Sequence, residues 1–207
     1  MHRITERKSD IAELDICKQR VNVPATSTWL NILNYEYFIV QNIVATLKHD
    51  KDGKYILRGD VMNSSTSEEM IVRALIWAYP LGNYNIRGLR YILSNIPDVV
   101  SKLMLCRNMF FSPTDFQQKF DSLCGIKYIG QSTASVLMYF FNVHLRVNKC
   151  NLCAVAVTKP LMNATNHFDE LQNIINLTYI EQIKLIHSIA NEMNVEFDQI
   201  ELFLRNY

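Results

Sequence analysis

Residues 123–141 carry the residue types best suited to hold a phosphate group. Gly130 is expected at a tight turn, because glycine reaches positive φ without strain. Ser132 and Thr133 follow in the first turn of a helix, where unpaired N–H groups and the positive end of the helix dipole attract anions. Such amides can hold a DNA phosphate whatever the base sequence. The alternative is a plain turn between two helices of a bundle.

The elements that must position this turn are helices. Beyond Gly130, apolar residues recur at the spacing of a buried helix face, namely Ala134, Leu137, Met138 and Phe141. Similar patterns predict helices over 26–48, 67–79, 86–94, 97–110, 114–123, 131–143, 151–158, 168–176, 178–193 and 196–205. Ser65 or Ser67 should cap the second of these helices, and residues 54–57 should form a short extended piece. We therefore expect an all-α, multi-helix, two-lobed domain over residues 1–207, with residues 160–207 as scaffold.

Composition limits the class of protein. Apolar residues make up 49% of the 207, enough for a sizeable core, and the net charge is only +1. Residues 102–159 nevertheless hold seven basic and two acidic side chains, a net charge of +5 around the turn. The alternative is chance clustering on solvated helix faces. The charged N-terminus, the absence of a long apolar run and five irregularly spaced cysteines predict a cytoplasmic protein that does not enter membranes. We expect it to be a monomer.

The turn resembles the helix-hairpin-helix motif of the base-excision DNA glycosylase superfamily. The match in residues 126–134 rests on Ile129, Gly130, Thr133 and Ala134, while Tyr128 stands where the family has its first hairpin glycine. Residues 66–82 resemble the family helix that ends in a DNA-intercalating loop, and residues 108–123 resemble the helix that leads into the hairpin. The sequence is most similar to small bacterial proteins with an 8-oxoguanine-glycosylase fold. Some glycosylases of this kind serve in phage defence.

The resemblance implies duplex DNA as the partner and assigns DNA-binding residues. Around the hairpin these are Lys127, Tyr128, Gly130, Gln131, Ser132, Thr133 and Lys149. Trp77 is the candidate for the base pocket, and Tyr79 or Asn83 for the wedge that fills the gap left by a flipped base. Trp77 also extends an apolar pattern, so a core position is the alternative.

Catalysis departs from the family pattern. Bifunctional members have a lysine two residues after the hairpin glycine, where this chain has Ser132. The resemblance therefore implies a monofunctional enzyme. About 18 residues later the family has an aspartate, whereas this chain has Cys150 followed by Asn151, and no aspartate occurs between Asp121 and Asp169.

Three residues are candidates for the missing aspartate. Asn151 could orient water or the sugar, or simply cap a helix. Cys150 could supply a thiolate if nearby Lys149 lowered its pKa, or act as a small buried hydrophobe. Asp60 is the best remote carboxylate, because Gly59 would let the backbone approach a ligand, although a turn or ion-pair role is the alternative. No metal site is expected from the cysteines and scattered histidines, and no cofactor except a monovalent cation at the hairpin carbonyls, which the resemblance permits.

Two hypotheses follow. The first is a monofunctional DNA glycosylase that excises a modified base and leaves an abasic site. The candidate bases are an 8-oxoguanine-like base and a phage-type hypermodified cytosine such as glucosylated hydroxymethylcytosine. The second is a non-catalytic DNA-binding module that kept the hairpin and lost the chemistry.

Overall fold

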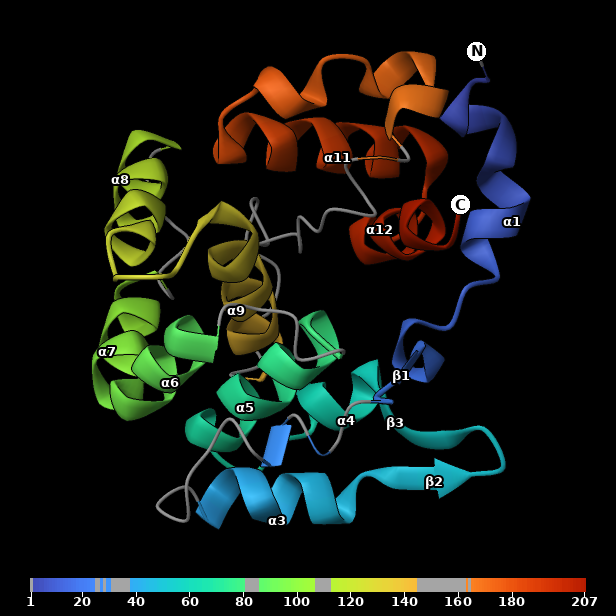
Figure 1. Cartoon of the computed structure of the whole chain (residues 1–207). Helices are drawn as coiled ribbons and strands as arrows, with labels where there is room; N and C mark the ends of the chain where they lie inside the picture. The colour runs from blue at the N-terminus through green and yellow to red at the C-terminus, as the bar shows by residue number, and fades with distance from the viewer. Residues whose placement is uncertain are drawn as a thin grey trace.

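The fold is built around one central helix, as a computed structural model of the whole chain shows (Figure 1). The structure describes residues 2–24, 27, 29–30, 38–80, 86–106, 113–144, 163 and 165–207. These residues form many helices and one small sheet, so the expected all-α class is confirmed. The predicted helix at 151–158 lies outside the described residues, as do parts of those at 26–48 and 97–110.

The central helix is α9 (Gln131–His144), and its burial explains its position. Every residue from Thr133 to Asn142 is buried, which means that all faces of the helix are covered and not only the predicted one. Its main neighbour is α5 (Ser67–Ala78). Trp77, near the end of α5, contacts Phe140, while Tyr79, just after α5, contacts Thr133 at the start of α9, so the end of α5 packs along α9.

Two groups of helices flank α9 (Figure 1). On one side lie α6 (Ile86–Ser94), α7 (Ile96–Leu105) and α8 (Pro113–Cys124). On the other side lie α11 (Tyr179–Met193), α12 (Phe197–Asn206) and the N-terminal η1 (Ile4–Arg7) and α1 (Lys8–Ala12). The N-terminus is tied to the C-terminal third through Glu170, whose carboxylate accepts hydrogen bonds from Arg3, Thr5 and the Ile4 amide.

A three-stranded antiparallel sheet borders α3 (Phe38–Thr46) and α4 (Arg58–Met62). The strand order is β1 (Arg20–Asn22), β3 (Gly53–Leu57) and β2 (Lys48–Asp50). In the register, Val21 is opposite Ile56, and His49 is opposite Lys54. The prediction of an extended piece at 54–57 is confirmed by β3. The other two strands, three residues each, were not predicted.

Several predicted helices begin and end within two residues of the observed ones, including those at 86–94, 114–123, 131–143, 178–193 and 196–205. Two details are corrected. The cap of α5 is Thr66, not Ser65 or Ser67, because the Thr66 hydroxyl accepts the Glu69 amide. In place of the predicted helix at 168–176 there are two short 3-10 turns, η4 (Asp169–Leu171) and η5 (Ile174–Asn176), interrupted by Asn173 with φ at 65°.

Candidate nucleic-acid interface

The hairpin between α8 and α9 is a short loop with alternating exposure. Gly125 follows the end of α8, where its amide donates to Asp121. Ile126 and Ile129 are buried and hold the loop to the core, whereas Lys127 and Gly130 are exposed. The buried isoleucines fix the loop so that its exposed residues face solvent, which is the arrangement that a phosphate-binding loop requires.

The residue with left-handed backbone in this loop is Tyr128, not Gly130. Tyr128 has a φ of 69°, and Gly130 is not among the positive-φ residues, so the expectation that Gly130 supplies this conformation was wrong. Tyrosine is costly in this region, by about 1–2 kcal/mol. Its ring lies edge-on to Tyr91, with centroids 5.7 Å apart, and the Lys127 ammonium lies 5.1 Å from its centroid. Tyr128 thus adopts a conformation suited to the family's glycine while its side chain makes contacts that glycine cannot.

Gly130 serves the site in a different way. Its carbonyl accepts the Ala134 amide at 2.9 Å, which makes Gly130 the cap residue of α9. Serine or aspartate at such a position would cover the first-turn amides with its side-chain oxygen, and glycine cannot. A Cβ at this position would meet no atom within 4 Å, so the space beside the first turn is open. The exposed Gln131 and Ser132 continue this surface, which can accept an anion at the positive end of the helix.

Tyr79 connects the end of α5 to the first turn of α9. Its hydroxyl and the Thr133 Oγ1 are 2.7 Å apart, and Thr133 is buried. Burial raises the pKa of Tyr79, although hydrogen bonds with Thr133 and Ser132 act in the opposite direction. The structure therefore places Tyr79 half-buried at the base of the hairpin helix, and its role as a wedge stays a prediction.

Trp77 is fully buried. Its ring meets Phe140 edge-on at 5.0 Å, and the Arg205 guanidinium lies over it at 3.7 Å. This placement fits the core alternative for Trp77, while a contact with a flipped base stays a prediction.

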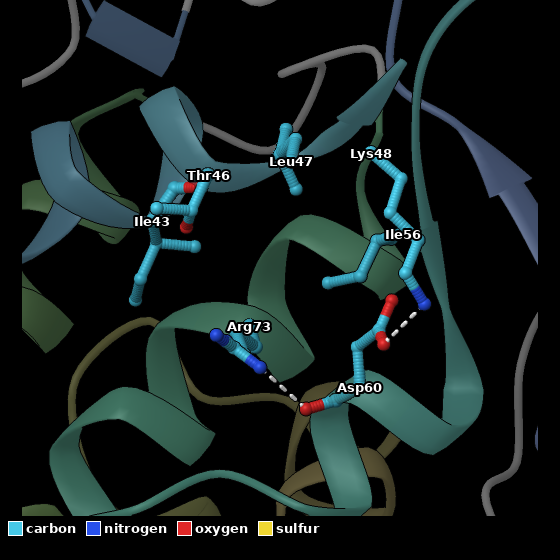
Figure 2. A pocket seen from close by; sticks show the side chains of 7 residues that line it. All are labelled: Ile43, Thr46, Leu47, Lys48, Ile56, Asp60 and Arg73. Atoms are coloured by element: carbon cyan, nitrogen blue, oxygen red, sulfur yellow. Dashed lines mark hydrogen bonds and ion pairs between the residues drawn. The ribbon is translucent and has the colours of Figure 1, made fainter. Parts of the chain in front are cut away.

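Asp60 lies in the part of the fold next to the sheet, as Figure 2 shows. Its carboxylate accepts the Lys48 ammonium at 2.7 Å and the Leu57 amide at 3.0 Å, and its backbone carbonyl accepts Arg73. Asp60 thus stabilises the start of α4 and pairs with a cation, as the turn or ion-pair alternative supposes. Arg73 precedes Tyr79 by about 9 Å of helix rise, so Asp60 meets α5 at some distance from the residue that contacts the first turn of α9.

Two hollows in the described structure are lined by residues outside the hairpin. One of about 90 Å³ is lined by Asp60 and its neighbours Ile43, Thr46, Leu47, Lys48, Ile56 and Arg73 (Figure 2). Another, of about 390 Å³, is lined by Cys17, Met62, Asn63, Ser64, Val143 and His144. A Cβ at Gly59 would lie 3.1 Å from the Cys17 carbonyl oxygen, so this glycine allows α4 to pack against η2 (Ile16–Lys18), and the approach of a ligand to this backbone stays a prediction.

A buried network of charged and polar groups was missed by the sequence analysis. The Arg58 side chain is fully buried and donates to Glu201 at 2.5 Å, to Gln19 at 3.0 Å and to the Tyr139 hydroxyl at 3.1 Å. The Tyr139 hydroxyl in turn donates to Asp198 at 3.2 Å. The network joins α4, α9 and α12, so the C-terminal third contributes charged partners as well as scaffold.

The buried network perturbs the titration of its members. Burial opposes the charge of Arg58, but Glu201, Tyr139 and Asp198 keep its pKa above the ordinary value. Burial raises the pKa of Asp198, partly offset by Arg58. Burial lowers the pKa of Arg205 below its ordinary value, and the attraction of Glu201 offsets this only in part. These groups hold helices together, and the only sequence signal for them was polar residues within otherwise apolar helix patterns.

Four of the predicted site residues lie outside the described residues, namely Asn83, Lys149, Cys150 and Asn151. In the described part of the chain, no three His, Cys, Asp or Glu side chains gather closely enough to hold a metal ion. Nor does that part contain a helix with the length and apolar character needed to cross a bilayer.

Comparison with known proteins gives the family. Searches of the curated proteins and of the solved structures found no match. A family model described as "Putative 8-oxoguanine DNA glycosylase OGG-like protein" matches residues 16–204, which include the hairpin, α5 and the buried Arg58, Tyr139 and Glu201. The expected resemblance is thereby confirmed. The chain belongs to this OGG-like family, which gives it a DNA glycosylase-like role and DNA as its partner.

Proposed function

We propose that this protein is a monofunctional DNA glycosylase that removes a modified base from duplex DNA and leaves an abasic site. The observation that carries the proposal is the glycine-capped first turn of α9, which is exposed and open, in a chain of the OGG-like family. This turn would anchor one phosphate of the strand that holds the target base.

The proposed reaction is a hydrolysis. The bond between C1′ of the sugar and the base nitrogen breaks, a water oxygen bonds to C1′, and the departing base receives a proton. The transition state carries positive charge on the sugar, so the site needs a fixed negative or dipolar group close to C1′. Asn151, Cys150 and Asp60 are the proposed candidates. The contacts of Asp60 with Lys48 and Leu57 favour the first two.

The absence of a second, strand-cutting step is proposed from Ser132. This exposed residue occupies the position at which bifunctional relatives place a Schiff-base lysine, and a hydroxyl cannot form that adduct. Borohydride should therefore trap no covalent complex, and the product should break only with heat, alkali or a separate endonuclease.

The direct test of activity is mass spectrometry of bases released from a panel of DNAs. The panel should contain 8-oxoguanine duplexes and phage DNA with glucosylated hydroxymethylcytosine, followed by alkali to reveal abasic sites. Release of one base class would support the proposal. Binding to DNA without release of any base would favour the non-catalytic module. The lack of an aspartate between Asp121 and Asp169 supports that alternative.

The candidate residues can be separated in single-turnover assays. If Asn151 or Cys150 acts at C1′, its replacement by alanine should slow excision on the order of 10²–10³-fold and leave DNA binding nearly unchanged. Asp60→Asn should then stay close to wild type. A loss of excision rate confined to Asp60→Asn would place the catalytic group in the sheet region. Excision at the wild-type rate by all three variants would overturn the assignment of all three residues.

A further inference from the structure

We propose that α6 and the hairpin form one continuous phosphate-binding surface, in which Arg87 and Arg90 contact the DNA backbone beside the phosphate held by α9. The inference rests on the proposed function for its partner, duplex DNA. It adds a second element to the interface, one that the hairpin motif does not contain.

An aromatic contact joins the two elements. Tyr91 on α6 and Tyr128 in the hairpin pack edge-on, with centroids 5.7 Å apart and ring planes at 67°. Both side chains are half-buried, so the contact lies at the edge of the core and continues to the surface. Edge-on aromatic pairs at this distance are attractive, so this pair keeps α6 against the hairpin.

The arginines of α6 lie at the surface. Leu89, Ile92 and Leu93 are buried and fix which face of the helix meets the core. Arg87 and Arg90 are exposed. Arg87 lies one turn before Tyr91 on the same side of the helix, and Arg90 neighbours Arg87 at the i, i+3 spacing. The arginines therefore lie beside the tyrosine contact that leads to the hairpin.

The charged side chains of α6 and of the hairpin are all positive. Arg87, Arg90 and Lys127 are the charged residues of α6 and of residues 125–133, and neither segment contains an acidic residue. A surface whose charged side chains are all positive, and which has open backbone donors, complements a polyanion such as the DNA backbone. The nearest charged sequence neighbour after α6 is Asp98, in the first turn of α7, where it complements the dipole of that helix.

The backbone of Tyr128 is left-handed. A tyrosine at a φ of 69° persists only where its surroundings over-determine it. Glycine would suit the backbone better, and glycine is what the helix-hairpin-helix pattern has at this position. The side chain therefore has a use that outweighs the strain, and one of its contacts, the ring pair with Tyr91, holds α6 to the hairpin.

The experiment is the salt dependence of binding to an unmodified duplex, measured for the full chain by fluorescence anisotropy. Each lost phosphate contact lowers the slope of log K against log salt by about 0.9. Arg87→Gln and Arg90→Gln together should lower it by about two. The charge-matched control is Lys8→Gln with Lys18→Gln, on exposed positions of the N-terminal segment across α9 from α6, and should leave the slope unchanged. Circular dichroism should show that both variants fold.

Tyr128→Gly tests the link between the two elements. Glycine suits the left-handed backbone at this position, and the substitution removes the ring that contacts Tyr91. In this background the two arginine substitutions should lower the slope by less than they do in the wild type. Equal losses in both backgrounds would overturn the role given to the tyrosine pair.

The outcomes separate the inference from the function on which it rests. If the wild type binds DNA and Gly130→Asp weakens that binding, but the arginine variant keeps the wild-type slope, α6 is not part of the interface and the proposed function stands. If the arginine variant keeps its slope and loses affinity for one base type only, the arginines read a base and the phosphate assignment is overturned. If the wild type binds no duplex at all, the function and the inference both fail.

Discussion

Two regions along α9 use positive charge in opposite ways. At its first turn, the exposed Lys127 and the open amides beside Gly130 face solvent, with no acidic residue in the loop. Further along, the fully buried Arg58 contacts Tyr139 and is paired with Glu201 and hydrogen-bonded to Gln19. Charge that is left accessible can bind a ligand, whereas charge that is enclosed and paired holds helices in place. The comparison separates residues that should affect DNA binding from those that should affect stability.

The largest expected effect is on stability, from Arg58→Met. The substitution removes the cation that is hydrogen-bonded to the buried Glu201, and breaking a buried pair in this way costs about 3–5 kcal/mol. Urea denaturation would measure the loss. The matched control is Arg58→Met combined with Glu201→Met, which removes both charges and should recover most of the stability. A double variant as unstable as the single one would show that the pair is not the source of the effect.

The second effect is on binding, from Gly130→Asp. Aspartate is a good helix cap, so this variant should be more stable than the wild type by a few tenths of a kcal/mol. Its carboxylate would occupy the first-turn amides and repel phosphate, which should weaken binding to every duplex about 10- to 100-fold. Anisotropy titrations with modified and unmodified duplexes check this. Loss for one base type only, or loss of stability, would contradict a phosphate site at this turn.

The third effect is a change in pH dependence, from Asp198→Asn. Burial raises the pKa of Asp198 in the folded state, so the folded state binds its proton more tightly than the unfolded state. As pH rises above about 3.8, ionisation of Asp198 therefore lowers the free energy of unfolding. This loss is complete above the pKa that Asp198 has in the folded state. Asparagine keeps an acceptor for Tyr139 and removes the titration. The stability of the variant relative to wild type should rise with pH in this window, and a relative fall would reverse the assigned sign.

The smallest effect is on stability, from Tyr128→Gly. The substitution relieves about 1–2 kcal/mol of left-handed strain and loses a ring pair worth about 0.5–1.5 kcal/mol, with added backbone entropy in the unfolded chain. The net change in the free energy of unfolding should be within about 1 kcal/mol. Thermal melts compared with Tyr91→Leu, which loses the same ring pair without relief of strain, would show whether the strain is real.

The sequence predicted what local patterns control. Helices such as α6, α9 and α12 follow from the spacing of their apolar residues, and the hairpin follows from Gly130 and the polar residues after it. The pairing of Arg20–Asn22 with β3 could not be predicted, since it joins short segments that are distant in sequence and lack an alternating pattern. The same holds for Arg58 and Glu201, which are separated by 143 positions.

The backbone of the hairpin shows a subtler limit. The sequence has a glycine at 130 and a tyrosine at 128, and propensity assigns the positive φ to the glycine. The structure has it at Tyr128, because the turn geometry decides which position is left-handed and the contact with Tyr91 offsets the cost. Conformational propensity ranks the residue types at a given position. It does not say which position of a turn will have the left-handed backbone.

The most direct test of the central claim is an NMR titration of the 24.1 kDa protein with a short duplex. If the first turn of α9 holds a DNA phosphate, the backbone amides of Gly130, Gln131 and Ser132 should shift and saturate together as duplex is added. The buried Nε–H of Arg58 should stay unchanged. Hairpin amides that do not move while other parts of the chain respond to DNA would contradict the account.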